Sequence, residues 1–114
     1  MALRISTLAV DCHQPDALGA FWNRVLGGEL HTDDDGDVVL AVPDLGMTIA
    51  FFADPEDKVI KNRWHLDLTP DDQDAEVARV IGLGAVRADI GQGEPSWVVL
   101  ADPEGNEFCI LSGR

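Results

Sequence analysis

The side chains best suited to catalysis or ligand binding lie in two short strand-like segments. One segment carries Arg63, His65 and Asp67 at alternate positions, and the other carries Glu107 and Cys109 at alternate positions. Because successive side chains of a strand point to opposite faces, the members of each set would share one face. If both faces line one hollow, an imidazole, a thiol and two carboxylates meet there.

An imidazole and a carboxylate in one hollow can move protons. His65 could act as a general base near neutral pH, oriented by a neighbouring carboxylate. A desolvated Glu107 would have a raised pKa and could donate or accept a proton. We therefore predict His65 and Glu107 as the catalytic candidates. The alternatives are a structural histidine at 65 and a solvated Glu107 beside a turn. Asp67 could instead serve the start of a helix, and Cys109 could be a buried, inert thiol.

Aromatic residues indicate a ligand with apolar or aromatic character. Trp97 is the strongest candidate for stacking on a flat ligand, because its indole offers area and one hydrogen-bond donor. Trp64 has the opposite parity to His65 and is expected to pack on the helix side of its strand. Phe51 and Phe52 alternate, so one of them faces the hollow; Phe51 is the candidate ligand contact.

The composition bounds the class of protein. The 114 residues fit one domain, and 46% apolar with 25% charged residues is typical of a globular chain. A net charge of −13 opposes nucleic acid and anionic membranes. We find no apolar run near the ~20 residues of a membrane helix and no signal-peptide core, which predicts a cytoplasmic protein with reduced cysteines.

Two shorter segments carry clustered charge. Lys58, Lys61 and Arg63 form the one basic cluster, which could attract an anionic ligand or be a solvated loop. The acidic run 33–37 lacks the glycine position and the terminal glutamate of a calcium loop, so it is interpreted as a turn. Phosphate-binding, dinucleotide-binding, serine-hydrolase and CxxC motifs are missing from the sequence.

The elements that must position these side chains follow one pattern twice, β-α-β-β-β. A first helix is expected from Pro15 to Leu26, ended by Gly27, and a second helix is expected with a Thr69 cap and an end at Gly82 and Gly84. The expected strands are 3–10, 29–32, 38–42, 47–53, 64–69, 85–90, 97–101 and 107–111.

A constant offset of 56 residues relates the two halves. Val10-Asp11 and Leu66-Asp67 end equivalent strands, and Gly28 and Gly84 end equivalent helices. The sequence therefore predicts an α+β fold in which two βαβββ units, about 1–56 and 62–114, form a single domain over 1–114. A curved mixed sheet would enclose a central cleft, where ligands tend to sit. Asp11, the counterpart of Asp67, joins the candidate ligand contacts.

Three motifs resemble the vicinal oxygen chelate superfamily, and within it the glyoxalase-like and bleomycin-resistance-like domains. They are FWNRVLGG at 21–28, NRWHLDLT at 62–69 and DPEGNEFC at 102–109. The resemblance spans roughly residues 3 to 112 and implies the fold above, a ligand cleft and a homodimer. It does not fix one function, because this fold hosts many chemistries.

The resemblance also implies where a metal would be held. Metal enzymes of the superfamily place His, Gln or Glu ligands on the first and fifth strands and on the last strand of each unit. His65 matches the fifth-strand position, and Cys109 stands where the last strand usually has Glu. The first-strand position falls near Thr7 or Ala9, and the fourth-strand position falls at Ala50 or Phe51. One match of four predicts no metal cofactor; if a metal is bound, His65 is the ligand.

Three functions remain open on this basis. The first is a binding protein for a small, partly aromatic or apolar molecule, without a catalytic metal. The second is an enzyme, a lyase, isomerase or dioxygenase-like member that uses His65 with Glu107 or Asp67 as acid/base or metal ligand. The third is an interaction module that associates through its sheet edges. The candidate ligand contacts are Asp11, Phe51, Arg63, His65, Asp67, Trp97, Glu107 and Cys109.

Overall fold

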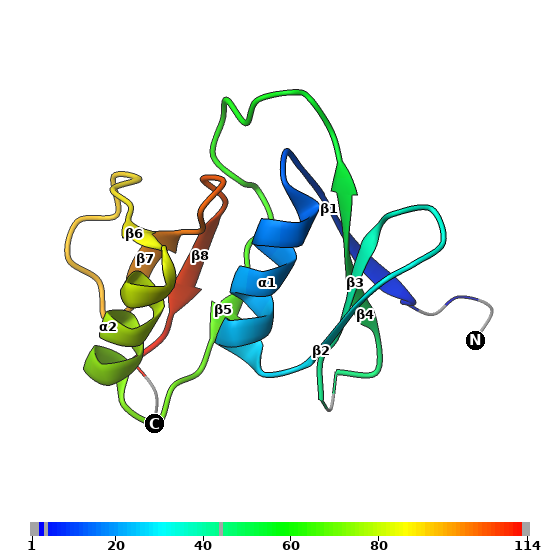
Figure 1. Cartoon of the computed structure of the whole chain (residues 1–114). Coiled ribbons are helices and arrows are strands. Elements are labelled where there is room, and N and C mark those ends of the chain that lie inside the picture. The colour runs from blue at the N-terminus through cyan, green and yellow to red at the C-terminus, as the bar shows by residue number, and fades with distance from the viewer. Residues whose placement is uncertain (1–2, 4, 44, 113–114) are drawn as a thin grey trace. The chain divides into compact units, whose positions relative to one another are not determined.

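The computed structural model describes residues 3, 5–43 and 45–112, and the chain divides into two units, Met1–Asp57 and Lys58–Arg114. The first unit contains β1 (Thr7–Cys12), α1 (Pro15–Leu26), β2 (Glu29–Thr32), β3 (Val38–Ala41) and β4 (Thr48–Ala53). The second contains β5 (Asp67–Leu68), α2 (Gln73–Leu83), β6 (Val86–Arg87), β7 (Val98–Ala101) and β8 (Glu107–Ile110) (Figure 1). The predicted α+β fold of two βαβββ units is confirmed.

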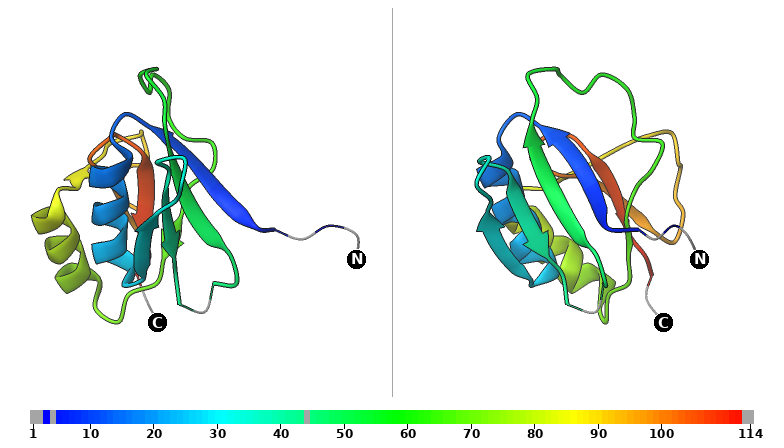
Figure 2. Two further views of the ribbon diagram at one scale, coloured as in Figure 1. Left: turned by 45° about the vertical axis from the view of Figure 1, so that its right-hand side comes forward. Right: turned by 90° about the vertical axis from the view of Figure 1, so that its right-hand side faces the viewer.

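Each unit has a four-stranded mixed sheet of the same topology. The strand orders are β1-β4-β3-β2 and β5-β8-β7-β6. In each sheet the first strand of the unit pairs in parallel with the last strand, and the other pairs are antiparallel. Figure 2 shows β1 lying along β4 in the first sheet. The shared topology agrees with the internal repeat; the enclosed central cleft stays a prediction.

Helix α1 matches the prediction at both ends. It begins with Pro15, whose missing N–H is no loss in a first turn, and Gly27 ends it in the left-handed conformation, with φ of 73°. Its buried face includes Leu18, Phe21 and Trp22, and the helix packs on β3 and β4. This apolar face therefore forms the core of the first unit.

Helix α2 begins later than the sequence predicts. Its cap is Asp72, whose carboxylate accepts the backbone N–H of Ala75 at 3.1 Å, so the Thr69 cap is wrong. Asp is preferred over Thr at the cap position of a helix. Gly82 lies inside the helix, and Gly84 ends it. No helix among the described residues is long and apolar enough to cross a membrane.

Several strands are shorter than expected. β1 starts at Thr7 because its parallel partner β4 starts at Thr48, and β5 is confined to Asp67–Leu68 opposite β8. Trp64 therefore precedes the strand instead of belonging to it. Its side chain is 87% exposed, so the expected packing on the helix side is wrong. Arg4 and Asp44, which fall in an expected strand and an expected turn, lie outside the described residues.

The acidic run 33–37 is a turn, as predicted. Its ends are joined by the backbone N–H of Asp33, which donates to the carbonyl oxygen of Asp37 at 2.8 Å. The Asp33 carboxylate accepts the backbone N–H groups of Asp35 and Asp37, each at 3.0 Å. This carboxylate is thus engaged in closing the turn.

Gly28 of the first unit leaves no room for a side chain. A Cβ at this position would overlap the backbone carbonyl oxygen of Ala41, which cannot move without shifting β3. We expect Gly28→Ala to lower the free energy of unfolding by about 1–3 kcal/mol. Gly82→Ala is the matched control, because α2 leaves open space there and alanine favours a helix by up to about 1 kcal/mol. Urea unfolding of both variants tests this; equal effects would contradict the close approach.

Candidate functional site

Strands β5 and β8 bring the predicted reactive side chains together in the second unit. Asp67 and Cys109 are direct partners in the parallel pair, and the backbone N–H of Cys109 donates to the carbonyl oxygen of Leu66 at 2.9 Å. His65 precedes the strand by two residues. Its Nδ1 lies 2.9 Å from Oδ1 of Asp67. The carboxylate therefore orients the imidazole and leaves Nε2 as the ring nitrogen available to a ligand.

Cys109 is a buried thiol beside Asp67, its direct partner in the strand pair. Burial raises the pKa of this thiol, and the neighbouring Asp67 carboxylate raises it further, whereas the ammonium group of Lys61 opposes the shift. The thiolate is the nucleophilic form of cysteine. The structure thus favours the inert-thiol alternative for Cys109.

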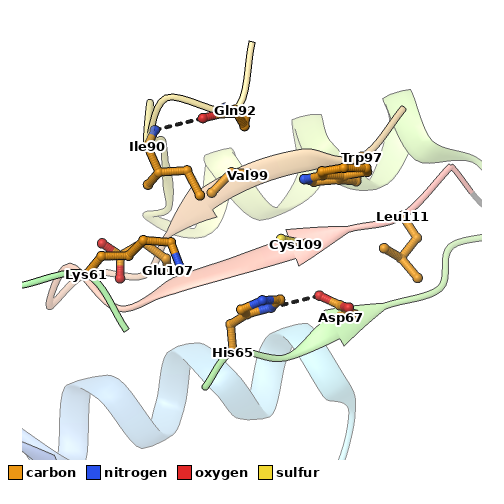
Figure 3. Close-up of a pocket in the computed structure, with 10 residues that line it drawn as sticks. All are labelled: Lys61, His65, Asp67, Ile90, Gln92, Trp97, Val99, Glu107, Cys109 and Leu111. Carbon is orange, nitrogen blue, oxygen red and sulfur yellow. Dashed lines mark hydrogen bonds and ion pairs between the residues drawn. The ribbon is translucent and has the colours of Figure 1, made fainter. Parts of the chain in front are cut away.

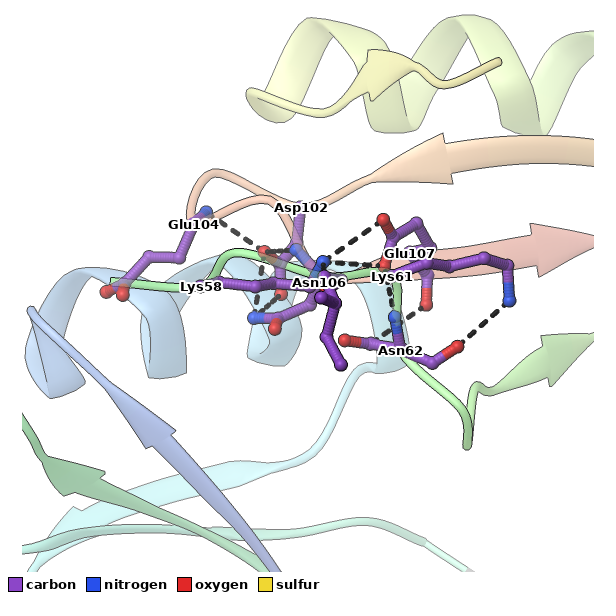
Figure 4. Close-up of polar contacts among 8 residues, drawn as sticks. Lys58, Lys61, Asn62, Asp102, Glu104, Asn106 and Glu107 are labelled. Carbon is purple, nitrogen blue, oxygen red and sulfur yellow. Dashed lines mark hydrogen bonds and ion pairs between the residues drawn. The ribbon is translucent and has the colours of Figure 1, made fainter. Parts of the chain in front are cut away.

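Glu107 is held by an ion pair and a backbone hydrogen bond (Figure 4). Its Oε1 lies 3.0 Å from Nζ of Lys58 and accepts the backbone N–H of Asn62 at 2.9 Å. Burial acts to raise the pKa of Glu107, but the hydrogen bonds from Asn62 and Lys58 outweigh it, and the pKa is lowered. The expected raised pKa is therefore wrong, because the side chain is ionised and already paired.

A pocket of ≈ 320 Å³ opens over these strands (Figure 3). Alternate residues of β7 and β8 face it, with Val99 from β7 and with Glu107 and Cys109 from β8. The side chains that face away, such as Phe108, are buried on the other face of the sheet. The lining comprises Lys61, His65, Asp67, Ile90, Gln92, Trp97, Val99, Glu107, Cys109 and Leu111.

Five of the predicted site residues share this pocket, namely His65, Asp67, Trp97, Glu107 and Cys109. The other three do not line it. Arg63 is exposed, and Asp11 is exposed on β1 of the first unit. Phe51 is fully buried and lies close to Gly19 of α1, in the core of the first unit. The structure therefore places Phe51 on the helix side of its sheet.

Part of the pocket lining could not be predicted from the sequence. Ile90 falls at the end of the expected strand 85–90, but β6 ends at Arg87, so Ile90 and Gln92 lie in an irregular segment where strand alternation does not apply. Gln92 shapes that segment itself, since its side-chain oxygen accepts the backbone N–H of Ile90 at 2.7 Å and its amide donates to the Ala88 carbonyl oxygen at 3.1 Å. The sequence identified Lys61 only as part of a basic cluster.

Comparison with known proteins decides the family. The glyoxalase-like domain family matches residues 7–111 of the chain. The chain belongs to this family. The resemblance to the vicinal oxygen chelate superfamily is thereby confirmed. No curated protein matches the sequence.

Solved structures share the fold of this glyoxalase-like domain at low sequence identity. A glyoxalase/bleomycin resistance protein/dioxygenase family enzyme from Burkholderia phytofirmans PsJN is 22% identical, with a TM-score of 0.72 over 92% of this chain and 94% of that chain. The oxidase ChaP-H2 is 18% identical, with a TM-score of 0.71 over 100% of this chain and 95% of that chain. The fosfomycin resistance protein FosX from Listeria monocytogenes is 16% identical, with a TM-score of 0.74 over 100% of this chain and 94% of that chain.

A divalent metal is the cofactor that the superfamily implies, and one solved form of FosX holds Mn(II). In the glyoxalase-like domain described here, ligand atoms of His65, Asp67 and Cys109 lie within 4.8 Å of one another. These nitrogen, oxygen and sulfur donors suit zinc, so a bound ion would be held by these three residues and would act as a Lewis acid. Without an ion, the Asp67 carboxylate pairs with Nδ1 of His65. Binding a metal through Cys109 would require loss of the thiol proton.

Proposed function

We propose that this glyoxalase-like domain binds a small, flat, largely apolar molecule in the pocket of its second unit, without a resident metal. The observation that carries the proposal is the pocket itself, which combines an apolar wall with one oriented polar pair. Its volume is within the lower range of small-molecule sites, which are mostly apolar with few polar groups.

Trp97 supplies the main contact in this proposal. Its side chain is 42% exposed at the pocket, although burial of an indole is strongly favourable. A flat ligand stacked on Trp97 would cover this surface, and Val99 and Leu111 extend the apolar wall. The Nε2 of His65 would then face a polar group of the ligand.

The proposal omits a metal because of the contacts of its possible ligands. The Asp67 carboxylate pairs with Nδ1 of His65 at 2.9 Å, so the carboxylate and that ring nitrogen already have a partner without a metal. The family positions on the first unit fall on residues such as Ala50 and Phe51, which carry no ligand atoms. A ligand held by stacking and hydrogen bonds needs no ion.

A second candidate function is an enzyme, and the 2.9 Å contact between His65 and Asp67 favours it. In this candidate Nε2 of His65 takes a proton from the bound molecule, and Asp67 stabilises the resulting imidazolium. Glu107 is a poor partner, because Lys58 and Asn62 already hold its carboxylate. This candidate would be supported if the protein converts a bound molecule and if His65→Gln abolishes that conversion but retains binding.

Binding of naphthalene-2-carboxamide, a flat neutral probe, tests the proposed function. We expect Trp97→Ala to weaken its binding at least about tenfold, since stacking on an aromatic side chain and burial of its area are lost. Trp64→Ala is the matched control, because Trp64 is exposed and does not line the pocket. Isothermal titration calorimetry measures both variants.

The same titration, repeated after treatment with a chelator, tests the metal-free part of the proposal. Unchanged affinity and a metal content well below one equivalent by elemental analysis are expected. Equal effects of the two tryptophan substitutions, or no binding by the wild-type protein, would contradict the pocket. Near-stoichiometric zinc or manganese, with binding lost on chelation, would instead support the metal enzyme.

A further inference from the structure

The pocket holds a lysine and a glutamate near one end of β8 and a tryptophan near the other, with Ile90 beside Glu107 and Asp67 beside Leu111 (Figure 3). Figure 3 shows Lys61 and Glu107 together toward the N-terminal end of the strand and Trp97 and Leu111 toward its other end. An elongated ligand would therefore meet charge at one end and an indole at the other. The sign of the charge at the polar end determines which ligand class fits.

Both carboxylates of the pocket already have partners. Glu107 lies 3.0 Å from Nζ of Lys58 and accepts the backbone N–H of Asn62. Asp67 lies 2.9 Å from the ring of His65. The charge of Glu107 is thus compensated by Lys58, and one oxygen of Asp67 is engaged by His65.

Lys61 is in a different position. Its ammonium group donates to the carbonyl oxygen of Asn62 at 2.9 Å, and no ion pair is found for it among the described residues. An ammonium group has three N–H donors, so two remain for a ligand. At this end of the pocket Glu107 is thus paired with Lys58, which does not line the pocket, and Lys61 is the lining cation without an ion pair among the described residues.

We propose that the pocket selects a small aromatic carboxylate, with its anionic group at Lys61 and its flat body on Trp97. This inference rests on the proposed function and names the class of ligand. A carboxylate at Lys61 gains charge-assisted hydrogen bonds that a neutral ligand lacks. The net charge of −13 opposes approach of an anion only weakly at physiological salt, where the Debye length is about 8 Å.

Two probes of the same shape test the inference on the full chain, namely naphthalene-2-carboxylate and its neutral amide, naphthalene-2-carboxamide. The wild-type protein is expected to bind the carboxylate at least about tenfold more tightly than the amide. Lys61→Gln is expected to remove that preference and to change amide binding less than about twofold. Arg63→Gln removes the same charge from a neighbouring exposed residue that does not line the pocket, and it should preserve the preference.

The outcomes separate this inference from the proposed function. If the wild-type protein binds both probes equally, or if Lys61→Gln and Arg63→Gln weaken carboxylate binding equally, the anion selectivity is overturned. In either case, amide binding that depends on Trp97 leaves the proposed function intact. Absence of carboxylate binding overturns the inference. The proposed function is then tested separately by the titration with the amide.

Discussion

Replacing Glu107 with alanine is expected to lower the free energy of unfolding by about 3 kcal/mol. The side chain is only 14% exposed, and its carboxylate accepts charge-assisted hydrogen bonds from Lys58 and from the backbone of Asn62. Each such bond contributes roughly 1.5–3 kcal/mol, and loss of the carboxylate leaves the Asn62 N–H without its acceptor. Urea unfolding at neutral pH measures the effect.

Replacing Glu107 should also disturb the pocket. Lys58 also donates to the carbonyl oxygen of Ile60 at 2.6 Å, so Glu107 holds the segment that leads to His65. Glu107 is therefore a positioning residue in this arrangement. Glu94→Ala is the matched control, since Glu94 is exposed and loses the same charge. A similar small loss in both variants would contradict the anchoring role.

The pH dependence of this contribution follows from the lowered pKa of Glu107. A carboxyl whose pKa is lower in the folded state stabilises the fold above its unfolded pKa and loses that contribution as the pH falls through the folded pKa. The difference in unfolding free energy between wild type and Glu107→Gln should therefore be largest at pH values above the ordinary pKa of 4.5 and should decrease at lower pH. A difference that grows on acidification would show that the pKa is raised instead.

Strand alternation explains why much of the site could be predicted. A period of two placed Glu107 with Cys109 on one face of β8 without knowledge of any contact. The same period placed His65 with Asp67 but also Arg63, which does not line the pocket because β5 begins only at Asp67. The parallel pairing of β5 with β8 then made Asp67 and Cys109 direct neighbours. The repeat of 56 residues likewise predicted the order of the elements, because both halves use the same helix and strand signals.

The ionisation of Glu107 could not be predicted in the same way. It depends on Lys58, 49 positions away, and on a backbone N–H from an irregular segment. The position of Phe51 shows a related limit. Alternation shows that Phe51 and Phe52 face opposite ways, but only packing against α1 decides which of them is buried.

Replacing Asp102 with alanine is expected to cost about 3–4 kcal/mol of unfolding free energy. Asp102 is 3% exposed and begins the turn between β7 and β8. Its carboxylate accepts the backbone N–H groups of Glu104 at 2.9 Å and Asn106 at 3.0 Å, and the Asn106 amide at 3.0 and 3.2 Å (Figure 4). Alanine would leave several partly buried donors without an acceptor, at roughly 1–3 kcal/mol each.

Because this turn joins β7 to β8, its loss should also disturb the pocket that the two strands line. Asp102→Asn keeps one side-chain oxygen and should recover part of the lost stability, as measured by urea unfolding. Asp89→Ala is the control for loss of charge, because its carboxylate accepts one exposed backbone N–H, that of Gly91 at 2.9 Å. If Asp102→Ala lowered the unfolding free energy as little as Asp89→Ala, the backbone hydrogen bonds alone would hold the turn. The Asp102 carboxylate would then not determine the register that brings Val99 opposite Cys109.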